Sequence, residues 1–122
     1  MHSYDIQLRR ADMDALGHLN NVVFAQYLDE ARADLLAGHE PWHLVVAGHR
    51  LTYRMPLTFG PDPVTVTSVV ERIGDTSFTL AHEVRDGEHV YLSATSTLVA
   101  MADNAPRSLT AAERTYLGAL GG

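Results

Sequence analysis

The hydrophobic residues of this chain follow a two-residue repeat in several segments, which is the periodicity of a β-strand with one buried face. Alternation predicts a first strand over residues 3–9. After residue 44, segments rich in Val and Thr and separated by turn residues predict four more strands. The predicted ranges of these strands are 45–55, 64–73, 76–85 and 89–101.

One segment carries the periodicity of an amphipathic helix instead. Over residues 21–37 the apolar side chains recur at spacings of three and four, so that they form one stripe for burial. Asn20 is a suitable N-cap, and Gly38 is a suitable stop signal. Asp29 and Arg32 are spaced to pair on the solvent side of this helix. A weaker helical pattern occupies residues 110–117.

The order of these elements, one strand, one long helix and then four strands, indicates an α+β fold. Short turns such as Asp86-Gly87 join consecutive strands, which implies antiparallel neighbours. The helix buries its stripe most simply against one face of that sheet. Because the chain has 122 residues and no linker or repeat, residues 1–122 are expected to form a single domain.

Composition narrows the possible functions. The formal net charge is −6, and all nine basic residues are arginines, which disfavours a nucleic-acid partner. The absence of Cys and Lys excludes thiolate metal sites, a Cys nucleophile and Schiff-base chemistry. No apolar run is long enough to span a membrane and no secretory signal is evident, so a cytoplasmic location with no membrane partner is expected.

Two metal-binding patterns occur, but each lacks what its chemistry needs. Residues 39–43 read His-Glu-Pro-Trp-His and match H-E-x-x-H, yet Pro41 disfavours the continuous helix that a zinc site requires. Residues 12–17 open like a calcium loop, but Leu16 and Val23 fall at ligand positions. No metal site is therefore predicted. The other strand or terminal histidines are expected to be surface or sheet-face residues: His2, His49, His82 and His89.

The strongest candidate chemistry lies in residues 12–21, which read Asp-Met-Asp-Ala-Leu-Gly-His-Leu-Asn-Asn and directly precede the helix. Free N–H groups at a helix start suit a developing oxyanion. A nearby carboxylate such as Asp14 can act on the same substrate carbon as base or nucleophile. Gly17 would let a ligand approach the backbone closely. The alternative is that these polar side chains only cap the helix and fold the loop.

This segment, followed by a helix that contains Tyr27 and Glu-Ala-Arg at 30–32, resembles the hotdog-fold acyl-CoA thioesterases of the 4-hydroxybenzoyl-CoA thioesterase-like group. The similarity continues through residues 53–56, 60–62 and 73–77 and covers about residues 4–101. The resemblance implies a hotdog fold, in which one long central helix is wrapped by a five-stranded antiparallel sheet. It also implies a homodimer or homotetramer whose sheets join edge to edge, with active sites between subunits.

The resemblance further implies roles for individual residues. Asp14 matches the catalytic carboxylate of the family, which acts as nucleophile or as base for water. The backbone N–H of Asn21 matches the donor that polarises the thioester carbonyl. A family subset places its catalytic Glu on the helix, which makes Glu30 a second candidate. Substrate binding is expected of Gly17, His18, Asn20, Phe24 and Arg54, with Arg32 as an alternative for the CoA phosphates.

The expected function is hydrolysis of an acyl thioester carried on CoA or on an acyl carrier protein. No cofactor is expected, since CoA would be part of the substrate. Two alternatives remain open at this point. One is a non-catalytic acyl-CoA-binding hotdog protein. The other is a hotdog hydratase or dehydratase, which would recruit His18, although the His-Phe-Pro-Gly-type loop of that group is absent.

Overall fold

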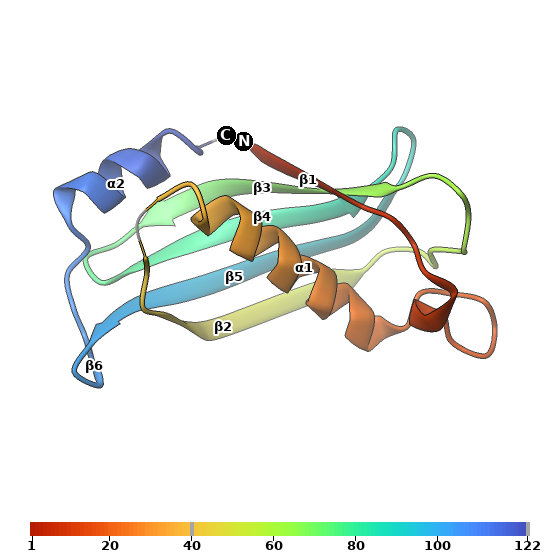
Figure 1. The fold of residues 1–122 in the computed structure, drawn as a ribbon, viewed down its shortest axis with the longest axis horizontal. Helices are drawn as coiled ribbons and strands as arrows, with labels where there is room; N and C mark the ends of the chain where they lie inside the picture. The colour runs from red at the N-terminus through yellow and green to blue at the C-terminus, as the bar shows by residue number, and fades with distance from the viewer. Residues whose placement is uncertain (40, 122) are drawn as a thin grey trace.

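The computed structural model describes residues 1–39 and 41–121, which form one antiparallel sheet with helices on one side of it (Figure 1). The strands are β1 (His2–Ile6), β2 (Leu44–Tyr53), β3 (Val64–Ile73), β4 (Ser77–Arg85), β5 (Val90–Ala102) and β6 (Ala105–Pro106). The helices are η1, a 3-10 turn (Arg10–Asp12), α1 (Asn21–Leu36) and α2 (Ala111–Gly118). The strand order is β1-β3-β4-β5-β2, with β6 paired to β5.

The α+β class and the antiparallel sheet are therefore confirmed, whereas the prediction of five strands is wrong. The sixth strand, β6, has two residues and follows a turn in which Asp103 and Asn104 both adopt positive φ. So short a strand has no detectable two-residue repeat. The single long helix of the prediction is a 16-residue α1, and α2 accompanies it, beginning at a capping box of Thr110 and Glu113. No helix in the described residues is long and apolar enough to cross a membrane.

The boundaries of α1 follow from its capping residues. The side chain of Asn20 accepts a hydrogen bond from the Val22 N–H at 3.0 Å, as predicted for the N-cap. The predicted reason for the helix end is wrong, because Gly38 does not adopt the left-handed conformation of a glycine C-cap. A Cβ at Gly38 would instead overlap the hydroxyl of Tyr116, a residue of α2. Gly38 therefore permits close packing between α2 and the end of α1.

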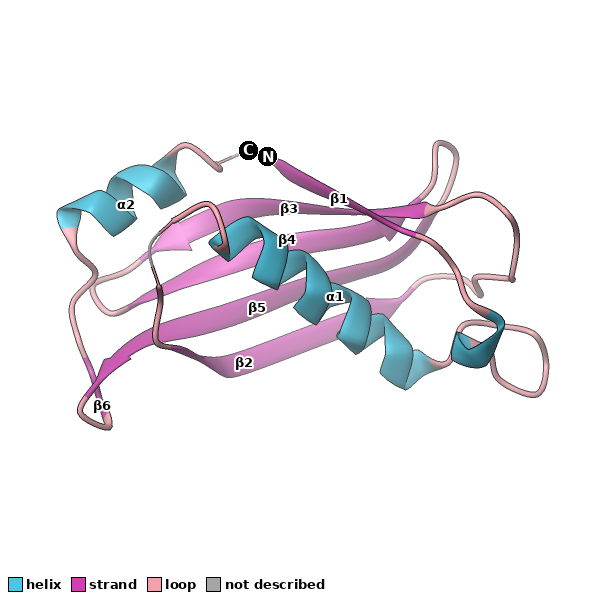
Figure 2. Cartoon of the chain, viewed as in Figure 1, coloured by secondary structure: helices cyan, strands magenta, loops and turns pink. Residues whose placement is uncertain are grey.

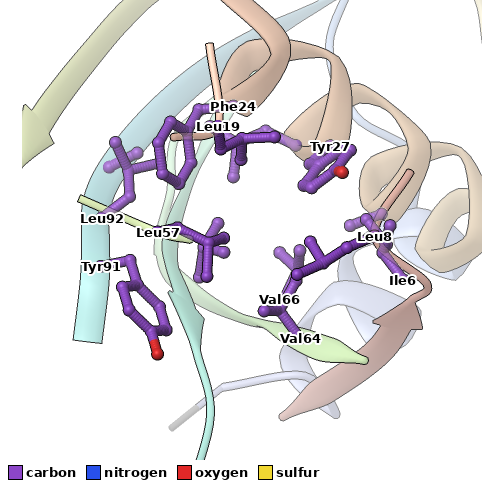
Figure 3. Packing of buried hydrophobic residues seen from close by; sticks show 14 residues of the cluster. Ile6, Leu8, Leu19, Phe24, Tyr27, Leu57, Val64, Val66, Tyr91 and Leu92 are labelled. Atoms are coloured by element: carbon purple, nitrogen blue, oxygen red, sulfur yellow. The ribbon is translucent and has the colours of Figure 1, made fainter. Parts of the chain in front are cut away.

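Helix α1 lies across one face of the sheet (Figure 1) and contributes buried side chains to both of two core clusters. The cluster beside the first half of α1, shown in Figure 3, includes Phe24, Tyr27, Leu57, Val66 and Leu92. The cluster beside the end of α1 includes Leu35, Val70, Phe78, Leu98 and Leu117. Burial of these side chains is the main stabilising contribution to the fold.

A row of buried polar side chains separates the two clusters. The Nδ1 and Nε2 atoms of His82 lie 2.8 Å and 3.2 Å from the hydroxyls of Ser68 and Ser96. From α1, Arg32 donates to the Ser96 hydroxyl at 3.2 Å and to Asp29 at 3.2 Å. The predicted Asp29–Arg32 pair is confirmed, but its placement on the solvent side is wrong, because Arg32 is only 6% exposed. His82 is a sheet-face residue, on the face that α1 covers.

The buried His82 makes the stability of the fold depend on pH. Burial, and then the nearby charges of Arg32 and His49, lower the pKa of His82 to about 3. The unfolded chain therefore binds a proton at His82 below pH ~6.5, whereas the folded chain binds it only near pH 3. Because the unfolded chain binds more protons in this range, the free energy of unfolding decreases as the pH falls. Between pH 7 and pH 4, urea unfolding should show wild type losing on the order of 3 kcal/mol more than His82→Gln. Equal losses in the two proteins would contradict this assignment.

Candidate active site

The loop between η1 and α1 lies at one end of the molecule, where the chain turns back before entering the helix (Figure 2). The Asp14 N–H donates to the His18 carbonyl at 2.7 Å, and Gly17 donates to the Asp14 carbonyl at 3.0 Å. Gly17 has a φ of +80°, which favours glycine at this turn. The Leu19 N–H donates to the Leu57 carbonyl at 2.7 Å, which ties the loop to the segment before β3. These bonds hold residues 14–18 as a closed turn.

Asp14, the predicted catalytic carboxylate, is exposed on this turn. Its Oδ1 accepts hydrogen bonds from the backbone N–H groups of Leu16 at 2.9 Å and His18 at 3.1 Å. Among the residues that the structure describes, its Oδ2 has no hydrogen-bond partner. The first oxygen therefore fixes the side chain, as the loop-folding alternative requires. The second oxygen is open to take a proton from water or to attack a carbon.

Asn20 and Asn21 form the start of α1 and have different hydrogen-bonding roles there. The Asn20 side chain accepts from Val22, and its carbonyl accepts from Val23 at 2.9 Å. The N–H of Asn21, at the first helical position, has no partner within the described part of the chain. An unpaired N–H at the positive end of a helix dipole is a suitable donor to an oxyanion.

Asp12 and Tyr27 form a buried hydrogen bond that joins the start of this loop to α1, a contact that the sequence did not indicate. The Tyr27 hydroxyl donates to Asp12 Oδ2 at 2.9 Å, and Arg9 Nε donates to the same oxygen at 3.0 Å. Both Asp12 and Tyr27 are buried. Burial, and then the bond to Asp12, raise the pKa of Tyr27 above its ordinary value. The sequence predicted Tyr27 as an apolar position of the helix and included it in the family resemblance, but gave its hydroxyl no role.

Tyr53, at the end of β2, is a second residue near the helix start to which the sequence assigned no role. Its hydroxyl donates to the Asn21 carbonyl at 3.2 Å, and its ring meets the Phe24 ring edge-on at 5.7 Å between centroids. Phe24 is only 3% exposed and points into the first core cluster (Figure 3). The role of Phe24 in substrate binding stays a prediction. Tyr53, in contrast to the buried Phe24, is exposed beside the first turn of α1.

The arginines suggested for CoA phosphates differ in accessibility. Arg54 is exposed, and its Nε donates to the Ser93 hydroxyl at 2.7 Å. Arg32 is buried, with its guanidinium held by Ser96 and Asp29. Of the two, Arg54 is therefore the accessible side chain.

A groove runs between α1 and β2 and begins one residue after Asn21. The part nearest the helix start is lined by Val22, Ala25, Gln26, Asp29, Glu30, Arg32, Val46 and His49. It shares Asp29, Arg32 and Val46 with a second hollow that continues to Trp42. Glu30 thus lines this groove rather than the Asp14 turn.

The described residues contain no group of three or more His, Asp or Glu side chains that could hold a metal ion. Of the H-E-x-x-H pattern at 39–43, Glu40 lies outside the described residues. His39 follows the end of α1 and packs its ring against Trp42 and Tyr116, at centroid distances of 5.0 Å and 5.3 Å.

The model of a protein family described as the thioesterase-like superfamily matches residues 8–112 of this chain. A thioesterase from Thermus thermophilus, solved in complex with coenzyme A and Zn, is 30% identical and has a TM-score of 0.86. That match covers 97% of this chain and 92% of the other. The PA2801 protein of Pseudomonas aeruginosa is also 30% identical, with 88% and 89% of the two chains covered and a TM-score of 0.78.

A predicted thioesterase from Bacillus stearothermophilus shares the fold, with a TM-score of 0.90 at 23% identity over 99% of this chain and 96% of the other. The search of curated proteins finds no match. The matched region of the family model includes the whole loop from Asp12 to Asn21 and all of α1.

Proposed function

The chain belongs to the thioesterase-like superfamily, and from that premise we propose that it hydrolyses an acyl thioester at the Asp14 turn. The observation that carries the proposal is that the loop before α1 and the first residue of α1 each carry a group with no hydrogen-bond partner in the described chain. Asp14 offers a carboxylate oxygen and Asn21 offers a backbone N–H, each without a partner among the described residues. A carboxylate and an oxyanion donor are the two groups that acyl transfer to water requires.

In the proposed reaction the thioester carbonyl oxygen accepts a hydrogen bond from the Asn21 N–H. Water attacks the carbonyl carbon while Asp14 Oδ2 takes its proton, and the negative charge that forms on the carbonyl oxygen is stabilised at the helix start. Collapse of this intermediate breaks the carbon–sulfur bond, and the leaving thiolate takes the proton from Asp14. This step releases the thiol and the carboxylic acid and restores the Asp14 carboxylate. Asp14 Oδ2 can instead attack the carbonyl carbon directly, which breaks the carbon–sulfur bond, expels the thiolate and forms an anhydride that water then hydrolyses. Both routes use the same two residues.

We propose acyl-CoA as the substrate, with acyl-carrier-protein thioesters as the alternative and with no cofactor apart from the CoA of the substrate. Support comes from the similar Thermus thermophilus thioesterase, which was solved with coenzyme A. The groove between α1 and β2 begins beside Asn21, and Val22, Ala25 and Val46 form the apolar part of its lining, against which an acyl group can pack. Gly17, His18, Asn20 and Arg54 are proposed to contact the rest of the substrate.

The proposal is tested by incubating the protein with acyl-CoAs that carry aromatic and short to long aliphatic groups, and measuring free thiol and free carboxylic acid together. Catalytic release of both products in equal amounts is expected for at least one acyl class. Binding of acyl-CoA without turnover, together with no activity on acyl-carrier-protein thioesters, would overturn hydrolysis and favour a non-catalytic acyl-CoA-binding protein.

We also propose that two copies of the chain pair along β2. This strand is at the end of the strand order, so one of its edges has no neighbour in the described chain. Val45 and Val46 are 44% and 47% exposed there, and exposed apolar edges of this kind favour pairing with another strand. Light scattering is expected to give the mass of a dimer or tetramer. A monomer at micromolar concentration would contradict this pairing.

A further inference from the structure

Asp12 lies at the junction of η1 and the Asp14 loop and has an unusual environment for a carboxylate. It is 7% exposed, and its Oδ2 accepts from the hydroxyl of Tyr27 and from Arg9 Nε. Of these donors, Tyr27 is fully buried inside the first core cluster, whereas the Arg9 side chain is 61% exposed. A buried carboxylate is costly unless it is hydrogen-bonded, so the Tyr27 hydroxyl fixes where Asp12 can lie.

The backbone of Asp12 connects this fixed point to both groups of the proposed site. Its carbonyl accepts from the Asn20 N–H at 3.0 Å, directly before the Asn21 donor. In the other direction, Asp14 follows Asp12 by two residues. Tyr27 itself belongs to α1, seven residues after its N-cap. The path from Tyr27 through Asp12 therefore closes a ring that contains the Asp14 turn and the first two turns of the helix.

We infer that Asp12 and Tyr27 together form the positioning unit of the site, setting the Asp14 carboxylate relative to the Asn21 N–H. The catalytic effect of this unit rests on the proposed hydrolysis, whereas the hydrogen bonds that form the unit do not depend on that function. Neither residue touches the reacting atoms. Small displacements of a catalytic group lower rates strongly, because the entropic advantage of a fixed geometry is lost.

Tyr27→Phe tests the inference, since it removes one hydroxyl and leaves the buried ring. It is expected to lower kcat at least about tenfold while KM changes less than about threefold, because the misplacement affects the chemical step more than binding. Tyr116→Phe is the matched control. Its hydroxyl donates to the Leu35 carbonyl at the far end of α1, so the control removes the same kind of group from a contact with the same helix, away from the loop. This control should retain the wild-type kcat.

Amide hydrogen exchange provides a readout that does not need activity. Tyr27→Phe is expected to speed exchange at the N–H groups of Leu16, His18 and Asn20, which report on the Asp14 turn and its link to Asp12, and Tyr116→Phe is not. If wild type hydrolyses no thioester, faster exchange in Tyr27→Phe alone still supports the positioning unit while the proposed function fails. Unchanged exchange at these amides would overturn the inference, and so would equal kcat in the two variants if wild type hydrolyses the thioester.

Discussion

Asp14→Asn is expected to lower kcat for thioester hydrolysis at least about a hundredfold, because it removes the group that accepts a proton or attacks carbon. The substitution is close to isosteric. The remaining amide oxygen can still accept from the Leu16 and His18 N–H groups, so the turn is expected to persist. The amide nitrogen then replaces the open oxygen. Steady-state thiol release, with circular dichroism to verify folding, measures the effect.

Asp14→Ala serves as the comparison, because it removes the loop-folding bonds as well as the open oxygen. Both variants should show this loss of kcat, but only Asp14→Ala should lose stability as well, by about 1 kcal/mol for the exposed bonds to Asp14 Oδ1. A folded Asp14→Asn protein that keeps most of the wild-type kcat would leave the carboxylate with only the loop-folding role.

Asn21→Pro is expected to lower kcat about a hundredfold to a thousandfold, the usual cost of removing one oxyanion donor. Proline is well accepted at the first position of a helix, where the N–H has no intrahelical partner. The preceding residue, Asn20, has φ −61° and ψ 134°, which is compatible with a following proline. The substitution therefore removes the proposed donor with little change to α1. Thermal unfolding should show a Tm near that of wild type.

Asn21→Ala is the control for this experiment, because it keeps the N–H and removes only the side chain. Its kcat is expected to stay within about threefold of wild type, since the Asn21 side chain makes no hydrogen bond among the described residues. Equal losses in the Pro and Ala variants would assign the effect to the side chain. Wild-type activity in Asn21→Pro would remove the Asn21 N–H from the mechanism.

Much of the fold could be predicted because local sequence signals agree with the tertiary structure. Helix α1 was expected over 21–37 and occupies Asn21–Leu36, since its periodicity and its N-cap both act locally. The range 64–73 is confirmed for β3, a Val- and Thr-rich segment between Pro63 and Gly74. Strand β6 was missed because pairing with β5, rather than its own two-residue sequence, defines it.

The buried polar row depends on strand register, which the sequence does not display. Ser68, His82 and Ser96 each occupy an inward position of a strand whose other inward residues are apolar. Each of these residues, considered alone, is only one polar side chain in an otherwise apolar inward face. They are brought together only when three strands and Arg32 from α1 are assembled, so the burial of Arg32 could not be predicted from its position on the helix.

The candidate site could be predicted in part, because a helix start with an acidic loop is a local feature. Asn21 is the first residue of the helix, Asp14 lies in the loop before it, and the family resemblance implies roles for both. The supporting residues were missed for a physical reason. Tyr27 occupies an apolar stripe, where its hydroxyl is invisible to periodicity, and the bond from Tyr53 to Asn21 joins positions 32 residues apart.

The most direct test of the central claim is a single-turnover measurement of thiol release with enzyme in excess, comparing wild type and Asp14→Asn on the acyl-CoA that wild type prefers. Catalysis by Asp14 predicts that the rate of the chemical step falls at least about a hundredfold in Asp14→Asn while the Kd for the acyl-CoA changes less than about threefold. Equal single-turnover rates in the two folded proteins would contradict it and remove Asp14 from the chemistry.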